Sequence, residues 1–72
     1  MQEKEREFKS EVLRSIRSRW HWSMFYVVNP LRQESVEARE QRIDHALIWE
    51  KIHAELSERW GIPSELKLPK KL

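Results

Sequence analysis

Apolar residues in the first third of the chain recur at steps of three and four: Phe8, Val12, Leu13, Ile16 and Trp20. This spacing places them on one side of an α-helix that begins near Glu3. Glutamates crowd the start of the segment and arginines follow, which is the order that the helix macrodipole favours. The pattern therefore predicts an amphipathic helix as the first element.

Residues 20–28 form the longest largely apolar run. Large apolar groups stand at both odd and even positions, so the alternation defines no polar face. The run is either a helix segment that is apolar nearly all round or a strand buried on both sides. We favour the helix because a lone strand has no visible partner in this chain. The alternative is an α+β fold with a short strand at residues 22–28.

Asn29 and Pro30 interrupt the first element, because proline disfavours the α conformation in the residue before it. A second helix then begins in one of two ways. Either Asn29 caps it with Pro30 at the first position or, as we expect, Ser35 caps it with Glu37 in the first turn.

The second helix is predicted to end at Trp60, where Gly61 suits a left-handed C-terminal residue and Pro63 prevents the helix from resuming. Residues 63–72 form a basic tail, for which we expect one further turn at most and then fraying.

The second helix carries two apolar faces. At about 100° per residue, one face holds Val36, Ile43, Leu47 and Ala54. The other lies nearly opposite and holds Ile48, Trp49, Ile52, Leu56 and Trp60. An intrachain hairpin can cover one face, and the other needs a second copy or a different protein. The predicted fold is therefore all-α: two long helices in an antiparallel hairpin over residues 1–62, completed by dimerisation or docking.

The chain's length and cysteine content strengthen the case for a partner. A chain of 72 residues buries too little surface for more than marginal stability, and without cysteine it has no disulfide to compensate. The absence of cysteine suits a reducing cytosol, so we expect a cytoplasmic protein. The charged N-terminus resembles neither a secretory signal nor a transit peptide, and the apolar run is too short to span a bilayer.

Charges are arranged in blocks, although the net charge is only +2. Residues 12–33 hold four arginines and no acid, whereas residues 34–58 hold seven acids and three bases. One interpretation is a nucleic-acid surface, and its candidate residues are Arg14, Arg17, Arg19, His21, Lys67, Lys70 and Lys71. The other is structural: these arginines are solvated, or pair across the hairpin with Glu34, Glu37 and Glu40.

Signals for chemistry are weak. Glu50 and His53 match the Glu-x-x-His pair of di-iron bundles, but an ordinary exposed pair is the simpler interpretation. His45 is expected on the same apolar face as Trp49 and Ile52, as an interface residue and not a catalytic one. With a single glycine the chain cannot form a glycine-rich phosphate loop, and no serine has a general base at a spacing typical of a catalytic pair. We therefore expect no enzyme, cofactor, metal site or small-molecule substrate.

Aromatic residues give the strongest functional signal. Trp22 and Phe25 fall off the apolar stripe of the first helix, so they must face something else. The candidate partner-binding residues are Trp22, Phe25, Tyr26, Trp49 and Trp60. The predicted function is a small non-enzymatic protein-interaction module, such as an adaptor, inhibitor or accessory subunit, that binds itself as a homodimer or another protein. Nucleic-acid binding is the alternative, and a di-metal dimer is the third.

Overall fold

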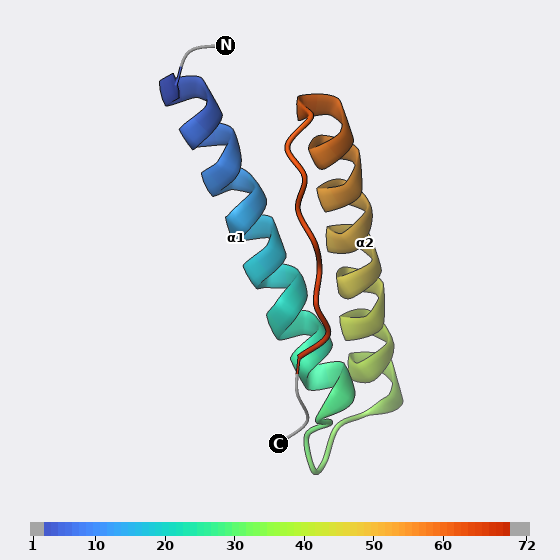
Figure 1. The fold of residues 1–72 in the computed structure, drawn as a ribbon. Helices are drawn as coiled ribbons and strands as arrows, with labels where there is room; N and C mark the ends of the chain where they lie inside the picture. Colours follow the sequence, from blue (N-terminus) through green and yellow to red (C-terminus); the bar gives the residue numbers. More distant parts are fainter. Residues whose placement is uncertain (1–2, 70–72) are drawn as a thin grey trace.

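The computed structural model describes residues 3–69, which form two antiparallel helices and an extended C-terminal segment (Figure 1). Helix α1 spans Glu3–Val28 and helix α2 spans Val36–Trp60, and the two pack against each other. The described residues contain no strand. The predicted all-α hairpin is thus confirmed.

Helix α1 continues through the aromatic run to Val28, so the alternative of a strand at residues 22–28 is wrong. A strand there would need a partner for its backbone groups, whereas the helix pairs them within the segment. The helix ends where the backbone N–H of Asn29 donates to the carbonyl oxygen of Phe25 at 2.8 Å. Pro30 follows, and its ring removes the next donor.

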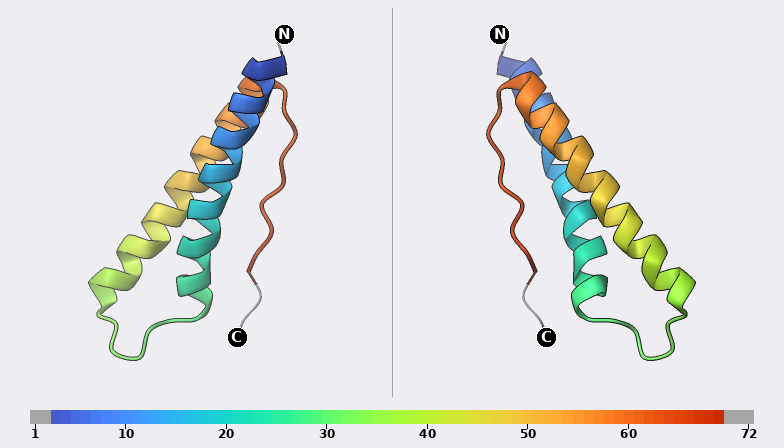
Figure 2. Two further views of the ribbon diagram at one scale, coloured as in Figure 1. Left: turned by 90° about the vertical axis from the view of Figure 1, so that its left-hand side faces the viewer. Right: turned by 90° about the vertical axis from the view of Figure 1, so that its right-hand side faces the viewer.

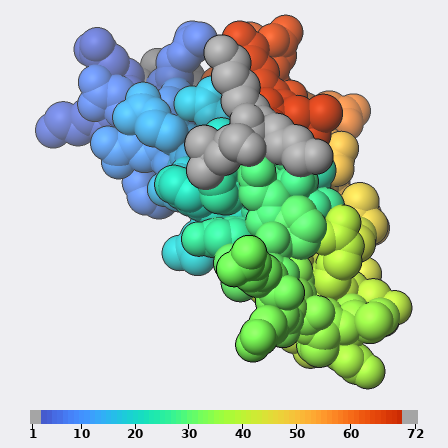
Figure 3. All heavy atoms as spheres, turned by 90° about the horizontal axis from the view of Figure 1, so that it is seen from below, coloured from blue at the N-terminus to red at the C-terminus, as the bar shows by residue number. Residues whose placement is uncertain are grey.

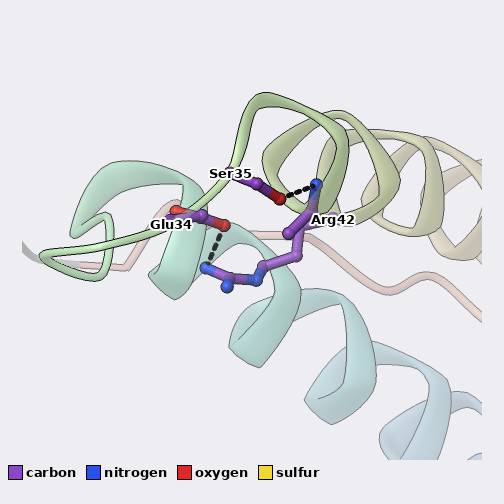
Figure 4. Close-up of polar contacts among 4 residues, drawn as sticks. Glu34, Ser35 and Arg42 are labelled. Atoms are coloured by element: carbon purple, nitrogen blue, oxygen red, sulfur yellow. Dashed lines mark hydrogen bonds and ion pairs between the residues drawn. The ribbon is translucent and has the colours of Figure 1, made fainter.

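Both ends of α2 are capped as expected. Ser35 has extended backbone angles, and its hydroxyl accepts the backbone N–H of Ala38 at 3.1 Å (Figure 4). At the other end Gly61 adopts φ 63°, and the N–H of Ile62 donates to the carbonyl of Ser57 at 3.1 Å. This is a Schellman motif, which requires a left-handed residue at the glycine position.

The buried core is small. Its apolar members are Leu13, Ile16 and Trp20 from α1 and Ala46 from α2. His53 of α2 is buried beside them. With so few buried side chains, α1 and α2 leave much apolar surface exposed.

The extended segment of residues 62–69, here called the strap, lies on one face of the hairpin (Figures 1 and 2). Ile62, Ser64 and Leu66 are half-buried, Pro69 is buried, and the intervening Pro63, Glu65 and Lys67 are exposed. The Ser57 hydroxyl donates to the Ile62 carbonyl at 2.5 Å and fixes the start of the strap. Residues 62–69 form no further helical turn, and the expected fraying is wrong for them because the half-buried Ile62, Ser64 and Leu66 pack on the helices.

The molecule is elongated, with principal dimensions of 48 × 22 × 15 Å. Residues 29–35 form the loop between α1 and α2. Seen from the loop end, the loop and the first turns of α2 spread to one side of the body (Figure 3). Among the described residues, no helix combines the length and apolarity needed to cross a membrane.

Candidate functional site

One of the two predicted apolar faces of α2 is uncovered. We call Val36, Ile43, Leu47 and Ala54 the α2 stripe; all four are exposed, Val36 by 70% and Leu47 by 57%. At about 100° per residue, the stripe lies roughly 90° around the helix from buried Ala46 and His53. It is therefore a separate surface, beside the core and not part of it.

The other predicted face of α2 is only partly covered. Trp49, Ile52, Leu56 and Trp60 are half-buried, and Ile48 is 54% exposed. The most buried positions are Ala46 and His53, roughly a quarter of a turn away, and Ser64 of the strap contacts His53. His45, expected on an interface stripe, is exposed.

An aromatic row formed by His21, Trp22, Phe25 and Tyr26 follows the last turns of α1. Adjacent ring centroids lie 5.4–5.6 Å apart in edge-to-face geometry. Trp22 is 54% exposed, Tyr26 is exposed to a smaller degree and Phe25 is half-buried. The row therefore presents Trp22 as its most accessible ring.

The two remaining candidate aromatics, Trp49 and Trp60, form cation–π contacts between α1 and α2. The Arg19 guanidinium lies 5.5 Å from the Trp49 ring centroid, and Lys9 Nζ lies 5.6 Å from that of Trp60. Arg42 stacks in the same way over Tyr26 at 5.5 Å. Each contact joins α1 to α2, so Trp49 and Trp60 contribute to the hairpin interface.

The acids and bases pair differently from the expected cross-hairpin pattern. Glu34 pairs with Arg42, with Oε1 and Nη1 2.6 Å apart (Figure 4), and its side chain is only 4% exposed. Among the described residues, Arg14, Arg17 and Arg19 form no ion pair, nor do Glu37 and Glu40. Of the two structural interpretations, pairing of these arginines with the three glutamates is wrong, because Glu34 pairs with Arg42 of α2. The three arginines are exposed to solvent, as the other interpretation expects.

Four of the seven predicted nucleic-acid residues meet around one groove. Arg14, Arg17 and His21 of α1 face Lys67 of the strap across an open space of about 760 Å³, here called the basic groove. Trp20, Ser18, Pro63, Ser64 and Glu65 complete its lining. Sequence reasoning does not predict these five as part of a nucleic-acid surface, because the path of the strap brings them together. Arg19 contacts Trp49 instead, and Lys70 and Lys71 lie outside the described residues.

His53 is 2% exposed, so the expectation of an ordinary exposed Glu50–His53 pair is wrong, although Glu50 is exposed. His53 Nε2 lies 2.9 Å from the Ser64 hydroxyl of the strap. Burial lowers the pKa of His53, and the positive charge of Arg17 lowers it further. No group of three His, Asp or Glu side chains able to hold a metal ion occurs within residues 3–69.

Comparisons with protein-family models, with curated proteins and with solved structures found no significant match. The functional argument therefore rests on the geometry of the α2 stripe, the aromatic row and the basic groove.

Proposed function

We propose that this chain is a non-enzymatic protein-interaction module that works as a homodimer, with the α2 stripe as the docking surface. The observation that carries the proposal is the exposed α2 stripe, since apolar side chains aligned along a helix mark an interaction face. In the same assembly, the aromatic and arginine-rich side of α1 stays free to meet further partners.

The spacing of the stripe supports a second copy as its occupant. Val36 and Ala54 are each nine positions from residue 45, and Ile43 and Leu47 are each two positions from it. Two antiparallel α2 helices related by a two-fold axis at residue 45 therefore place Val36 opposite Ala54, and Ile43 opposite Leu47. The surface is complementary to itself.

The charges beside the stripe fit the same register. Glu40 and Lys51 flank one edge of the stripe and Arg39 and Glu50 flank the other, at about 100° per residue. Across the two-fold axis, Glu40 lies on the same edge as Lys51 of the second copy, about one residue rise (about 1.5 Å) from the same level, and Arg39 has the same relation to Glu50 of the second copy. Opposite charges thus meet on both edges, although α2 as a whole is acidic.

Two adjacent residues allow a matched test. Leu47 lies on the stripe and Ile48 lies about 100° away, and the two are almost equally exposed, at 57% and 54%. We expect the wild-type chain to show a concentration-dependent dimer by sedimentation equilibrium over about 5–500 μM, the range for a small interface. Leu47→Gln shifts this equilibrium to monomer, whereas Ile48→Gln leaves it unchanged.

Far-UV circular dichroism of both variants checks that the helices are intact. A wild-type chain that is monomeric over the whole concentration range contradicts the proposal, as does equal weakening by the two substitutions.

A further inference from the structure

The basic groove shares no residue with the α2 stripe and needs its own explanation. We propose that it binds single-stranded nucleic acid: Arg14, Arg17 and Lys67 contact the backbone phosphates, and Trp22 stacks on a base. This proposal is independent of dimerisation through α2.

The charge in the groove favours an anion. Its lining contains three permanent cations, Arg14, Arg17 and Lys67, and a single acid, Glu65. None of these cations forms an ion pair within residues 3–69. The acids of α2 do not line the groove, so its positive charge is available to a ligand.

The shape of the groove favours an extended chain of phosphates. Arg14, Arg17 and His21 stand on successive turns of α1, which spreads them over about 10 Å at 1.5 Å per residue. A smaller cavity of about 180 Å³ shares Arg14 and Arg17 and continues the space past Ile62. Cations set in a row beside an open channel match the backbone of a single strand better than one isolated phosphate.

The aromatic row at the end of the groove distinguishes nucleic acid from a polyanion without bases. His21 lines the groove, and its ring meets the Trp22 ring edge-to-face at 5.6 Å. The neighbouring Trp22 is more than half exposed. A base leaving the groove next to His21 is therefore close to the exposed Trp22 ring, and stacking on aromatic rings is how sequence-tolerant single-strand binders hold bases.

The test uses the full chain and fluorescently labelled 12-nucleotide dT and U oligomers, followed by anisotropy at about 50–200 mM salt. We expect saturable binding that weakens with salt. Arg14→Gln combined with Arg17→Gln should weaken it at least tenfold and reduce the log–log salt slope by about 1.4, at about 0.7 per phosphate contact. Arg32→Gln combined with Arg59→Gln removes the same charge outside the groove and should change affinity by less than threefold.

Stacking is tested separately. Trp22→Ala should weaken oligomer binding by about 5- to 100-fold, the range for one stacked base, and leave binding of inorganic polyphosphate unchanged. Phe8→Ala, which removes another exposed ring of α1 away from the groove, should have no effect.

Circular dichroism checks folding, and Lys67→Gln in the strap replaces the arginine pair if that variant loses helicity. The proposal is overturned if the oligomers do not bind saturably at 50 mM salt, if the control arginine pair is as damaging as the groove pair, or if Trp22→Ala leaves oligomer binding unchanged.

Discussion

His53 joins three parts of the molecule. Its ring is buried in α2, its Nε2 contacts Ser64 of the strap, and Arg17 of α1 lies close enough to lower its pKa in addition to the effect of burial. In the unfolded chain the imidazole titrates near its ordinary pKa of about 6.5. Between the two pKa values, the unfolded chain binds a proton that the folded chain does not.

Stability should therefore fall on acidification below about pH 6.5, and the loss should be complete once pH is below the lowered pKa of His53 in the folded state. Thermal unfolding from pH 8 to pH 5 measures this. His53→Gln, which does not titrate, should flatten the dependence across this range. His45→Gln removes an exposed imidazole from the same helix and should leave it in place. An unchanged slope in His53→Gln would show that other groups set the dependence.

The Glu34–Arg42 pair fixes the loop against the start of α2. The Glu34 side chain is 4% exposed and its Oε2 has no hydrogen-bond partner in the described structure, so Arg42 supplies its main compensation. Arg42→Met should lower the free energy of unfolding by about 2 kcal/mol, because it leaves a carboxylate buried without its countercharge.

The double variant Arg42→Met with Glu34→Gln should regain about 1 kcal/mol of that loss, because neither charge is then stranded. Urea unfolding measures both. Glu5→Gln, which removes half of the exposed Glu5–Lys9 pair, should cost less than about 0.5 kcal/mol. Additive losses from the Glu34 and Arg42 substitutions would mean that the two side chains are not coupled.

At the scale of elements, the strap packs on the helices through every second residue, and no strand of the described structure pairs with it. Leu66 faces the helices and is half-buried, whereas Leu68, two positions on, is 69% exposed. The shift from strict alternation coincides with burial of Pro69. The same residue type thus occupies one packed and one exposed position within three residues.

Leu66→Ser should therefore lower the free energy of unfolding by about 1 kcal/mol, as expected for exposing half of a leucine side chain. Leu68→Ser should change it by less than about 0.3 kcal/mol, as is usual for exposed positions. Chemical unfolding followed by tryptophan fluorescence measures both changes. Equal effects would mean that the strap is not docked in this orientation in solution.

Helix boundaries were predictable because local chemistry sets them. Ser35 satisfies a free backbone donor at the start of α2, and Gly61 adopts the left-handed angle that ends it, so each signal acts within a few residues. The two caps therefore depend little on the rest of the chain. The continuation of α1 through Trp22 is predictable on a different ground, because the sequence offers no second segment with which a strand there could pair.

The position of the strap was not predictable in the same way, nor was the burial of Ala46 and His53 a quarter of a turn from the predicted apolar face of α2. Ile62, Ser64 and Leu66 alternate as a strand would, but a strand needs a partner and the sequence offers none. Only the packed structure places the strap against His53 and brings Lys67 to the same groove as Arg14 and Arg17. The sequence therefore shows the positive charge of residues 12–33, but it does not predict the basic groove, because the groove forms only where the strap packs beside α1.

At the scale of the whole molecule, a hairpin with a small core and an exposed stripe on α2 gains most from pairing along that stripe. The proposed two-fold axis at residue 45 makes the α2 surface its own partner, with apolar pairs along the centre and opposite charges at the edges. Any other register moves Ile43 and Leu47 away from each other and separates Glu40 from Lys51 of the second copy. The register is therefore testable through its charges alone.

Glu40→Lys places a lysine beside Lys51 of the second copy at two symmetric positions, so it should weaken the dimer by roughly 5- to 30-fold. Lys51→Glu should weaken it to a similar extent by placing two acids together. Mixing the two variants should restore association, because each lysine at position 40 then meets a glutamate at position 51, and each native Lys51 meets a native Glu40. Glu40 and Lys51 stand three turns apart within one helix, so rescue by mixing arises only between copies.

Glu55→Lys makes the same charge change away from the stripe edges and should leave the dimer intact. Sedimentation velocity of the single variants and of their equimolar mixture gives the result, and a mixture as monomeric as its components would exclude this register.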